Sequence, residues 1–344
     1  MRFFTGALLL MASLHAGAEV YELPPAGVDV IGNITVVEAG YDDTLIDIAR
    51  RHGLGYHDIV RANPDVDIWL PGEGTRVMLP ARFVLPSGPR EGLILNLAEY
   101  RMYYFPEPGP GETPVVMTYP MSIGRMDWET PLGMTRVVQK ARNPSWYVPE
   151  SVRQERIDEG RTPLPRVVPP GPDNPLGTRS LRLGIPGYLI HGTNRPAGVG
   201  MRVTHGCIRM FPEDIEFLFD NVGLETPVRI VNEPVKIGWD GDALVMEVHP
   251  LLDEAPATTV DEPGGEVHVE VSADDAPIET TEASARDPLT YATERFVHIT
   301  SERGGRLDWD RVEALIGAAT GVPSPVGEAD AEAAEAELLS SRDD

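Results

Sequence analysis

The stretch from His191 to Met210 carries the side chains of this chain that best suit covalent catalysis. It holds the only cysteine, Cys207, and two of the eight histidines, His191 and His205. A cysteine thiol has a pKa of about 8.5, so a base or a cationic neighbour must favour the thiolate at neutral pH. A lone cysteine is more often a small buried hydrophobic residue. The prediction of a nucleophile therefore depends on the combination of groups.

The positions around these side chains also suit acyl transfer. Gly206 has no side chain, so the backbone beside the cysteine can come close to a substrate, and N–H groups there could face a developing oxyanion. The apolar run at residues 188–190 predicts a strand that ends at His191. Active-site side chains are often placed where a strand gives way to a loop.

The longer pattern resembles the signature of the L,D-transpeptidase catalytic domain, the YkuD-like family. His191-Gly192-Thr193 is followed by Thr204-His205-Gly206-Cys207-Ile208-Arg209, with the cysteine sixteen residues after the first histidine. The resemblance covers roughly residues 90 to 231. Further matching segments are Tyr119–Gly124, Thr130–Gly133, Asn143–Tyr147 and Val168–Gly177.

This resemblance implies a peptidoglycan L,D-transpeptidase that works through a thioester. Cys207 would attack the carbonyl of the diaminopimelate residue in a tetrapeptide stem, and the terminal D-alanine would leave. The acceptor would be an amine, either of a second diaminopimelate or of a lysine in an outer-membrane lipoprotein. The implied partners are stem peptides, glycan strands and, as an alternative acceptor, that lipoprotein. No cofactor is expected.

The resemblance also implies roles for single residues of the motif. His191 would be the general base, with its ring oriented by a backbone carbonyl, for which Gly192 is the nearest candidate. His205 would support the thiolate or the oxyanion site. The N–H groups of Gly206 and Cys207 would bind the oxyanion.

Two further residues of the motif, Arg209 and Thr193, are predicted to bind substrate. The planar guanidinium of Arg209 suits a stem carboxylate. An ion pair with Glu213 or Asp214 is an equally good alternative for Arg209. The aromatic pair at residues 146–147 would line the substrate groove or fill the core.

The predicted fold is a mainly β catalytic domain at residues 90–231, which by resemblance is a YkuD-like β-sandwich with short helices. Alternating apolar residues from Gly92 onward predict its strands. Residues 148–180 are rich in proline and charge and predict a long ordered loop that serves as a lid or binding wall. Pro212–Val222 predicts a helix that braces the cysteine loop.

Residues 33–81 predict a small module of strand, helix, helix and strand, which resembles LysM. The helices are expected at Thr44–Arg51, capped by Asp42 or Asp43, and at Tyr56–Ala62. The resemblance implies binding of glycan strands that contain N-acetylglucosamine. Because fold does not imply function, a packing module without sugar contacts is the alternative.

The ends of the chain predict export and an appendage. Residues 1–18 read as a cleavable signal peptide with an apolar stretch and small residues before Glu19, which places the mature protein in the periplasm. Residues 19–33 predict an extended lead-in. Residues 232–323 predict a small α+β extension like that of the ErfK/YbiS envelope group, and residues 324–344 a disordered acidic tail.

Composition narrows the classes of partner. The 344 residues include 54 acidic against 29 basic side chains, a formal charge of −25, which argues against nucleic acid and anionic membranes. Beyond the signal, no stretch of about 20 apolar residues predicts a membrane span in the mature chain. A single cysteine cannot form a disulfide within its own chain, which favours a chemical role after export.

Three other functions are consistent with some of these features. His191, His205 and Cys207 could be three zinc ligands of a hydrolase, with water as the fourth. No acidic residue is fixed near them as a base or as a partner of the ligands, and the longer motif resembles the transpeptidase pattern. A catalytically inactive glycan-binding envelope protein would form no thioester. A cysteine peptidase of the cell wall is the third alternative. Such an enzyme usually has its cysteine before its histidine, whereas in this chain His191 comes before Cys207.

Overall fold

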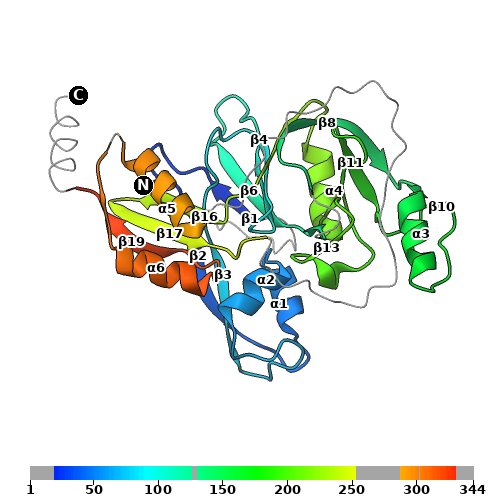
Figure 1. Cartoon of the computed structure of the whole chain (residues 1–344), viewed down its shortest axis with the longest axis horizontal. Helices are drawn as coiled ribbons and strands as arrows, with labels where there is room; N and C mark the ends of the chain where they lie inside the picture. The colour runs from blue at the N-terminus through cyan, green and yellow to red at the C-terminus, as the bar shows by residue number, and fades with distance from the viewer. Residues whose placement is uncertain (1–18, 126–129, 253–286, 302, 331–344) are drawn as a thin grey trace, which may run out of the picture.

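The computed structural model describes residues 19–125, 130–252, 287–301 and 303–330. The predicted signal peptide, and a strand expected at Val267–Val271, lie outside the described residues. Figure 1 shows a central sheet, an N-terminal unit packed against it and a C-terminal unit at the opposite end from α3 and α4. In the part of the chain that is described, no helix is long and apolar enough to cross a membrane.

The central unit is built on one sheet of nine strands in the order β1-β6-β5-β4-β15-β8-β11-β12-β14. Most neighbours are antiparallel, whereas β4 pairs with β15 and β12 with β14 in parallel. A mainly β catalytic domain with few helices is therefore confirmed. The strands are β1 (Glu19–Glu22), β4 (Gly92–Asn96), β5 (Arg101–Phe105), β6 (Val115–Pro120), β8 (Gly133–Arg142), β11 (Arg179–Leu183), β12 (Leu189–His191), β14 (Ile208–Arg209) and β15 (Pro227–Val231).

One face of this sheet is covered by α4 (Pro212–Asn221), close to the predicted helix. A proline at the first turn costs no hydrogen bond, because that N–H has no partner within a helix. Ile215, Leu218 and Phe219 then recur on one side and are buried against the sheet. Their packing fixes the chain that leaves β14, so α4 braces the cysteine loop.

The stretch at residues 148–180 is not the loop predicted. It contains α3 (Glu150–Asp158), and β10 (Val167–Val168) pairs with β9 (Trp146–Tyr147). The helix has a weak apolar side with only Val152 buried. Its polar composition explains why periodicity does not predict it. Two short strands elsewhere, β7 (Ile123–Gly124) and β13 (Arg202–Thr204), pair in parallel, and a 3₁₀ turn, η1, spans Pro196–Gly198.

The N-terminal unit has the predicted order of strand, helix, helix and strand. Its elements are β2 (Val30–Glu38), α1 (Leu45–Arg51), α2 (Tyr56–Ala62) and β3 (Arg76–Val84). The predicted cap is wrong, because Thr44 and not an aspartate is the N-cap of α1. The Thr44 hydroxyl accepts the N–H of Asp47 at 3.0 Å, and the Asp47 carboxylate accepts the N–H of Thr44 at 3.3 Å. This reciprocal pair satisfies two N–H groups that a helix start otherwise leaves open.

The N-terminal unit shares its core with the central sheet. Ile48 and Phe83 of the unit belong to the same buried cluster as Ile94 and Tyr103 of β4 and β5. In addition, residues 19–22 of the predicted extended lead-in form β1, which pairs antiparallel with β6 and so adds a strand to the central sheet. The unit therefore packs as part of the catalytic body.

The C-terminal unit is a four-stranded sheet with two helices. It contains β16 (Val235–Asp240), β17 (Ala243–Val248), α5 (Pro288–Thr300), β18 (Arg306–Leu307), α6 (Trp309–Ala318) and β19 (Ser324–Glu328), in the sheet order β16-β17-β19-β18. The prediction that residues 324–344 form a disordered tail is wrong at its start. There β19 pairs with β17 and buries Val326, whereas residues 331–344 lie outside the described chain.

A buried ion cluster joins this unit to the rest. The ammonium of Lys236 on β16 lies 2.8 Å from a Glu99 oxygen and 3.0 Å from a Glu247 oxygen, and it donates to the carbonyl of Val84 at 2.7 Å. Lys236, Glu99 and Glu247 are at most 2 % exposed. Glu99 lies between β4 and β5, Glu247 on β17 and Val84 at the end of β3. One cation thus holds groups from all three units.

Candidate active site

The register of β12 and β14 brings His191 next to the strand that directly follows Cys207. Ile190 lies opposite Ile208, and His191 lies opposite Arg209. Both isoleucines belong to the buried core, and successive side chains of a strand point to opposite faces. His191 therefore points away from that core. Cys207 lies directly before β14, and its thiol donates to the carbonyl of Gly187 at 3.7 Å.

The imidazole of His191 is set up to accept a proton. Its Nδ1 lies 2.6 Å from the carbonyl oxygen of Gly192, the contact expected from the sequence. A carbonyl only accepts, so Nδ1 carries the proton and Nε2 the lone pair. Within the described chain this Nε2 has no hydrogen-bond partner. Complete burial, aided by the positive charge of Arg209, lowers the pKa of His191 to about 3, against the opposing effect of the Gly192 hydrogen bond.

Two threonine hydroxyls hold the backbone around the cysteine. Thr130 donates to the carbonyl of Gly206 at 2.8 Å, and Thr204 donates to the carbonyl of Cys207 at 2.6 Å. Gly206 has a φ of 104°, in the region that favours glycine. Its N–H donates no hydrogen bond within the residues described. Neither threonine was predicted as a site residue, although both lie in the motif segments.

His205 belongs to a cluster with a carboxylate and a guanidinium. Its Nε2 lies 2.6 Å from a Glu155 oxygen and 2.8 Å from Arg125 Nη2, and Arg125 and Glu155 form an ion pair at 2.5 Å. Partial burial raises the pKa of Glu155, but hydrogen bonds from His205 and Arg125 outweigh it and leave the pKa below its usual value. The expectation of no acidic partner is therefore wrong. Glu155 comes from α3, 50 residues before His205, and no local sequence signal indicates it.

The cysteine lies beneath a cover of apolar side chains. Cys207 is 1 % exposed. It packs in a cluster with Trp146, Val148, Val152, Leu176 and Leu189. The aromatic pair at 146–147 is divided, because Trp146 fills this cluster and Tyr147 is exposed. Val152 of α3 belongs to this cover, so the helix helps to close the sulfur off from solvent.

The two predicted substrate-binding residues are also deep. Arg209 is 2 % and Thr193 4 % exposed, and the Thr193 hydroxyl accepts the N–H two residues on at 2.9 Å. The alternative partner Glu213 receives both of its hydrogen bonds from Arg50, each at 2.7 Å. The other, Asp214, is buried, which together with the charge of Glu213 raises its pKa to about 8. Glu213 is therefore held by the N-terminal unit.

The N-terminal unit also contacts the loop between the histidine and the cysteine. The N–H of Tyr56, at the start of α2, donates to the carbonyl of Val199 at 3.0 Å. Next to it, Gly200 has a φ of 90°, and a Cβ there would lie 2.4 Å from the Tyr56 nitrogen. Only glycine permits this approach. The first helices of the chain thus brace the connector of the site.

The geometry gives no support to the zinc alternative. Among the described residues, one group of three metal-ligating side chains has its ligand atoms within 4.8 Å of one another, and it consists of Glu99, Glu247 and His249. His191, His205 and Cys207 are not gathered in this way. Between the two glutamates the Lys236 ammonium already supplies a cation.

Comparison with known proteins agrees with this site. Residues 90–230 match the family model of the L,D-transpeptidase catalytic domain, YkuD. The chain is 40 % identical over 260 residues to the probable L,D-transpeptidase YcfS of Escherichia coli, covering 74 % of this chain and 80 % of that protein. The chain belongs to the L,D-transpeptidase family. It is therefore a transferase that acts on peptidoglycan.

Other L,D-transpeptidases match over the same breadth. ErfK/SrfK of Salmonella typhimurium is 39 % identical over 71 % of this chain and 78 % of its own length. YbiS of Escherichia coli is 38 % identical over 70 % of this chain and 78 % of its own length. The similarity therefore extends well beyond residues 90–230.

The pKa of His191 leads to a pH prediction for this L,D-transpeptidase. With a pKa of about 3 in the folded enzyme, the imidazole stays neutral down to about pH 4. An ordinary histidine, with a pKa of about 6.5, would lose roughly thirtyfold of its neutral form at pH 5. We expect kcat/KM for D-alanine release to show no acid limb near pH 6.5. Such a limb in the pH profile would contradict a neutral, buried His191.

Proposed function

We propose that Cys207 and His191 carry out the acyl transfer. The observation that supports this most is the neutral His191 ring, which the Gly192 carbonyl holds with Nε2 unprotonated, on the strand that pairs with the one directly after Cys207. In the first half-reaction Nε2 takes the thiol proton, the sulfur attacks the diaminopimelate carbonyl, and His191 returns the proton to the departing D-alanine nitrogen. In the second half-reaction an amine attacks the thioester, His191 takes its proton, and the thiol is restored.

The oxyanion of each tetrahedral intermediate would be bound by backbone N–H groups at Gly206 and Cys207. The N–H of Gly206, without a hydrogen bond in the described chain, supports this role. Thr130 and Thr204 fix the adjoining carbonyls and so preorganise the turn. The loss of one such donor costs about 2.7–4 kcal/mol in other enzymes.

His205, Arg209 and Thr193 would act on the substrate side of the site. We propose that His205, held by Glu155, supports the oxyanion turn and does not replace His191 as the base. Arg209 would bind a stem carboxylate through its planar guanidinium. Thr193 would line the same site once the cover moves.

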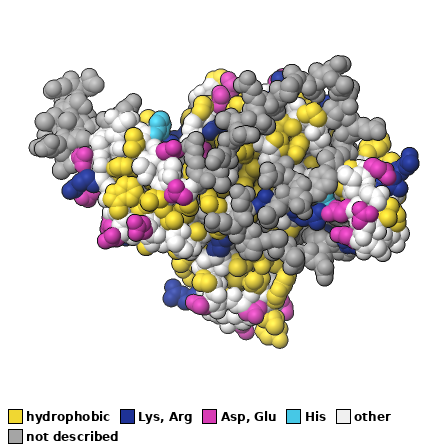
Figure 2. Space-filling view, in the orientation of Figure 1, with side chains coloured by type: hydrophobic (Ala, Val, Ile, Leu, Met, Phe, Trp, Pro, Cys, Tyr) yellow, Lys and Arg dark blue, Asp and Glu magenta, His cyan; other side chains and the backbone are white. Residues whose placement is uncertain are grey.

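For the N-terminal unit we propose a LysM-like role in binding glycan strands. It exposes large apolar side chains where a soluble protein usually has polar ones: Tyr41 is 81 %, Trp69 61 % and Leu70 81 % exposed. Figure 2 shows hydrophobic side chains gathered at the tip of this unit. Such side chains suit stacking on sugar rings, and contiguous exposed apolar groups commonly mark binding sites.

We further propose that the enzyme is exported to the periplasm by residues 1–18 and that its acceptor is a lysine of an outer-membrane lipoprotein. The breadth of similarity to the ErfK and YbiS proteins supports this, because it includes parts of the chain outside the catalytic domain. A second diaminopimelate is the alternative acceptor.

The test supplies purified protein with a disaccharide tetrapeptide and two competing acceptors. One acceptor is a peptide that ends in lysine, and the other is a disaccharide tripeptide whose diaminopimelate amine is free. We expect D-alanine release, a thioester on Cys207 by mass spectrometry, and mainly the lysine-linked product. Release without either conjugate would show a hydrolase, and absence of release would reject the proposed reaction. A diaminopimelate-linked product alone would reject the lipoprotein acceptor.

A further inference from the structure

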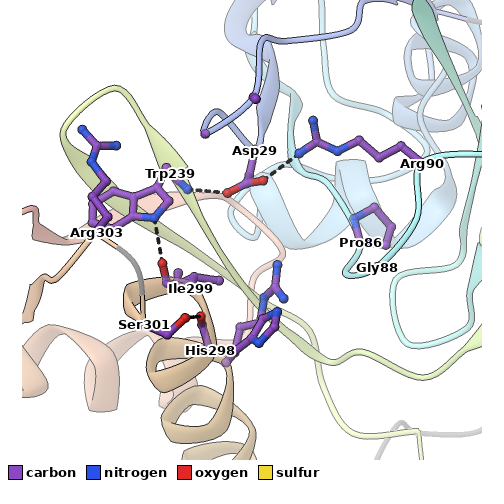
Figure 3. Close-up of a pocket in the computed structure, with 12 residues that line it drawn as sticks. Asp29, Pro86, Gly88, Arg90, Trp239, His298, Ile299, Ser301 and Arg303 are labelled. Atoms are coloured by element: carbon purple, nitrogen blue, oxygen red, sulfur yellow. Dashed lines mark hydrogen bonds and ion pairs between the residues drawn. The ribbon is translucent and has the colours of Figure 1, made fainter. Parts of the chain in front are cut away.

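A cavity of about 770 Å³ lies between the C-terminal unit and two segments from the first part of the chain. Figure 3 shows Asp29 and Arg90 on one wall and residues of β16 and α5 on the other. Its charged and aromatic lining residues are Asp29, Arg90, Trp239, Arg295, His298 and Arg303. This volume is in the range of small-molecule sites. In Figure 1 the C-terminal unit lies at the opposite end of the molecule from α3 and α4.

The walls of this cavity are held rigidly. One Asp29 oxygen binds Arg90 at 2.6 Å, and the other accepts the N–H of Trp239 at 2.9 Å. The indole N–H of Trp239 donates to the carbonyl of Ile299 at 3.2 Å, and the guanidinium of Arg303 lies 4.5 Å from the centre of the indole. These contacts join three separate segments, so the cavity is a preformed feature of the fold.

The cavity has one guanidinium more than its carboxylates can balance. Asp29 pairs with Arg90, and Arg303 pairs with Asp242. Arg295 forms no ion pair with any described residue, and its Nε donates to the carbonyl of Ile237 at 3.2 Å, which leaves both terminal amino groups for a ligand. Burial lowers the pKa of Arg295; the negative charges of Glu233 and Asp29 oppose this effect, and the like charge of Arg90 adds a smaller lowering. An anion in direct contact would offset the cost of burying this guanidinium.

The size of the charge indicates the kind of anion. One guanidinium without an ion pair in the described chain matches the single negative charge of a carboxylate better than the charge of a phosphate dianion. Its two parallel N–H groups also fit the two oxygens of a carboxylate. In a chain with a formal charge of −25, long-range attraction cannot concentrate anions. Recognition must therefore come from this local geometry.

We propose that this cavity is a second substrate site, which binds a free carboxylate of a peptidoglycan stem peptide with Arg295 as its anchor. The assignment to a stem peptide rests on the proposed function. A stem bound here would tether the wall polymer while another stem reacts at Cys207. The site would thus raise the local concentration of substrate without taking part in the chemistry.

The test measures binding of a soluble stem tripeptide, L-alanyl-γ-D-glutamyl-diaminopimelate, to the full mature chain by calorimetry. Cys207 is first alkylated with iodoacetamide to prevent reaction at the sulfur, and any peptide bound through Arg209 is common to all variants, so it cancels in the comparison. We expect Arg295→Gln to weaken binding at least tenfold. The matched control is Arg311→Gln on α6, an exposed arginine outside the cavity lining, which should bind as the parent does. His298→Glu, an exposed position at the cavity, should also weaken binding by charge repulsion without loss of a buried contact.

Several outcomes would overturn the site. Equal binding by the parent, Arg295→Gln and His298→Glu would place the peptide elsewhere. If the tripeptide with amidated carboxylates binds as tightly as the unmodified tripeptide, the site does not recognise a carboxylate. Inorganic phosphate that binds as tightly as the tripeptide would show a general anion site. D-alanine release by the unalkylated parent is measured in parallel, so that failure of the second site and failure of the proposed reaction are told apart.

Discussion

Replacing Cys207 with alanine is expected to lower D-alanine release from a tetrapeptide at least roughly 10⁴-fold, because the reaction then has no atom to form the thioester. The rate of D-alanine release by Cys207→Ser should fall nearly as far. A serine hydroxyl ionises far less readily than a thiol, and a neutral imidazole alone would have to activate it. Release is measured by mass spectrometry at saturating substrate and again at low substrate.

The matched control is Ile208→Val, the next residue along the chain. Ile208 faces the opposite side of the sheet and is 1 % exposed, so this change tests disturbance of the strand without touching the reacting group. Its cost in stability should be about 0.5–1.5 kcal/mol. We expect turnover within a fewfold of the parent. An alanine variant at position 207 that keeps its turnover would end the thioester mechanism.

Replacing Lys236 with methionine is expected to lower the free energy of unfolding by about 3–5 kcal/mol, the usual cost of leaving a buried charge without its partner. The change leaves Glu99 and Glu247 facing each other without the ammonium that lies within 3.0 Å of both. It also removes the hydrogen bond that the Lys236 ammonium donates to the Val84 carbonyl. Urea unfolding at neutral pH measures the effect, provided that one transition reports all three units.

The chain offers its own control, because Lys140 is its only other lysine. Lys140 donates to the carbonyl of Val222 at 2.5 Å near the surface, so Lys140→Met should cost less than about 1 kcal/mol.

The pH dependence distinguishes the lost charge pairing from lost packing. Burial raises the pKa of Glu99 and of Glu247 even with the lysine in place. Without Lys236 both carboxyls should hold their protons to still higher pH in the folded state than in the unfolded state. The folded variant then binds more protons, so its stability should rise relative to the parent as the pH falls. A deficit that stays constant between pH 8 and pH 5 would contradict this explanation.

Local sequence patterns predict several elements of the fold well. The helix at Tyr56–Ala62 has the predicted bounds, because Asn63-Pro64 stops it by backbone sterics that act between neighbours. The helix at residues 212–221 follows from a first-turn proline and an apolar side. By contrast, β19 and α3 are largely polar segments whose structure depends on partners elsewhere in the chain. The periodic spacing of apolar residues therefore cannot predict them.

The sequence alone determined which side chains could react, because the types and spacing of His191, Gly206 and Cys207 are fixed along the chain and resemble one family. Only the tertiary structure decided how deeply these side chains are buried, which partners they have and whether they are protonated. It buried the thiol under the segment around α3, brought Glu155 to His205 across 50 residues, and lowered the pKa of His191 to about 3. Burial, desolvation and long-range contacts arise from packing between distant segments, and such packing leaves no local pattern to read.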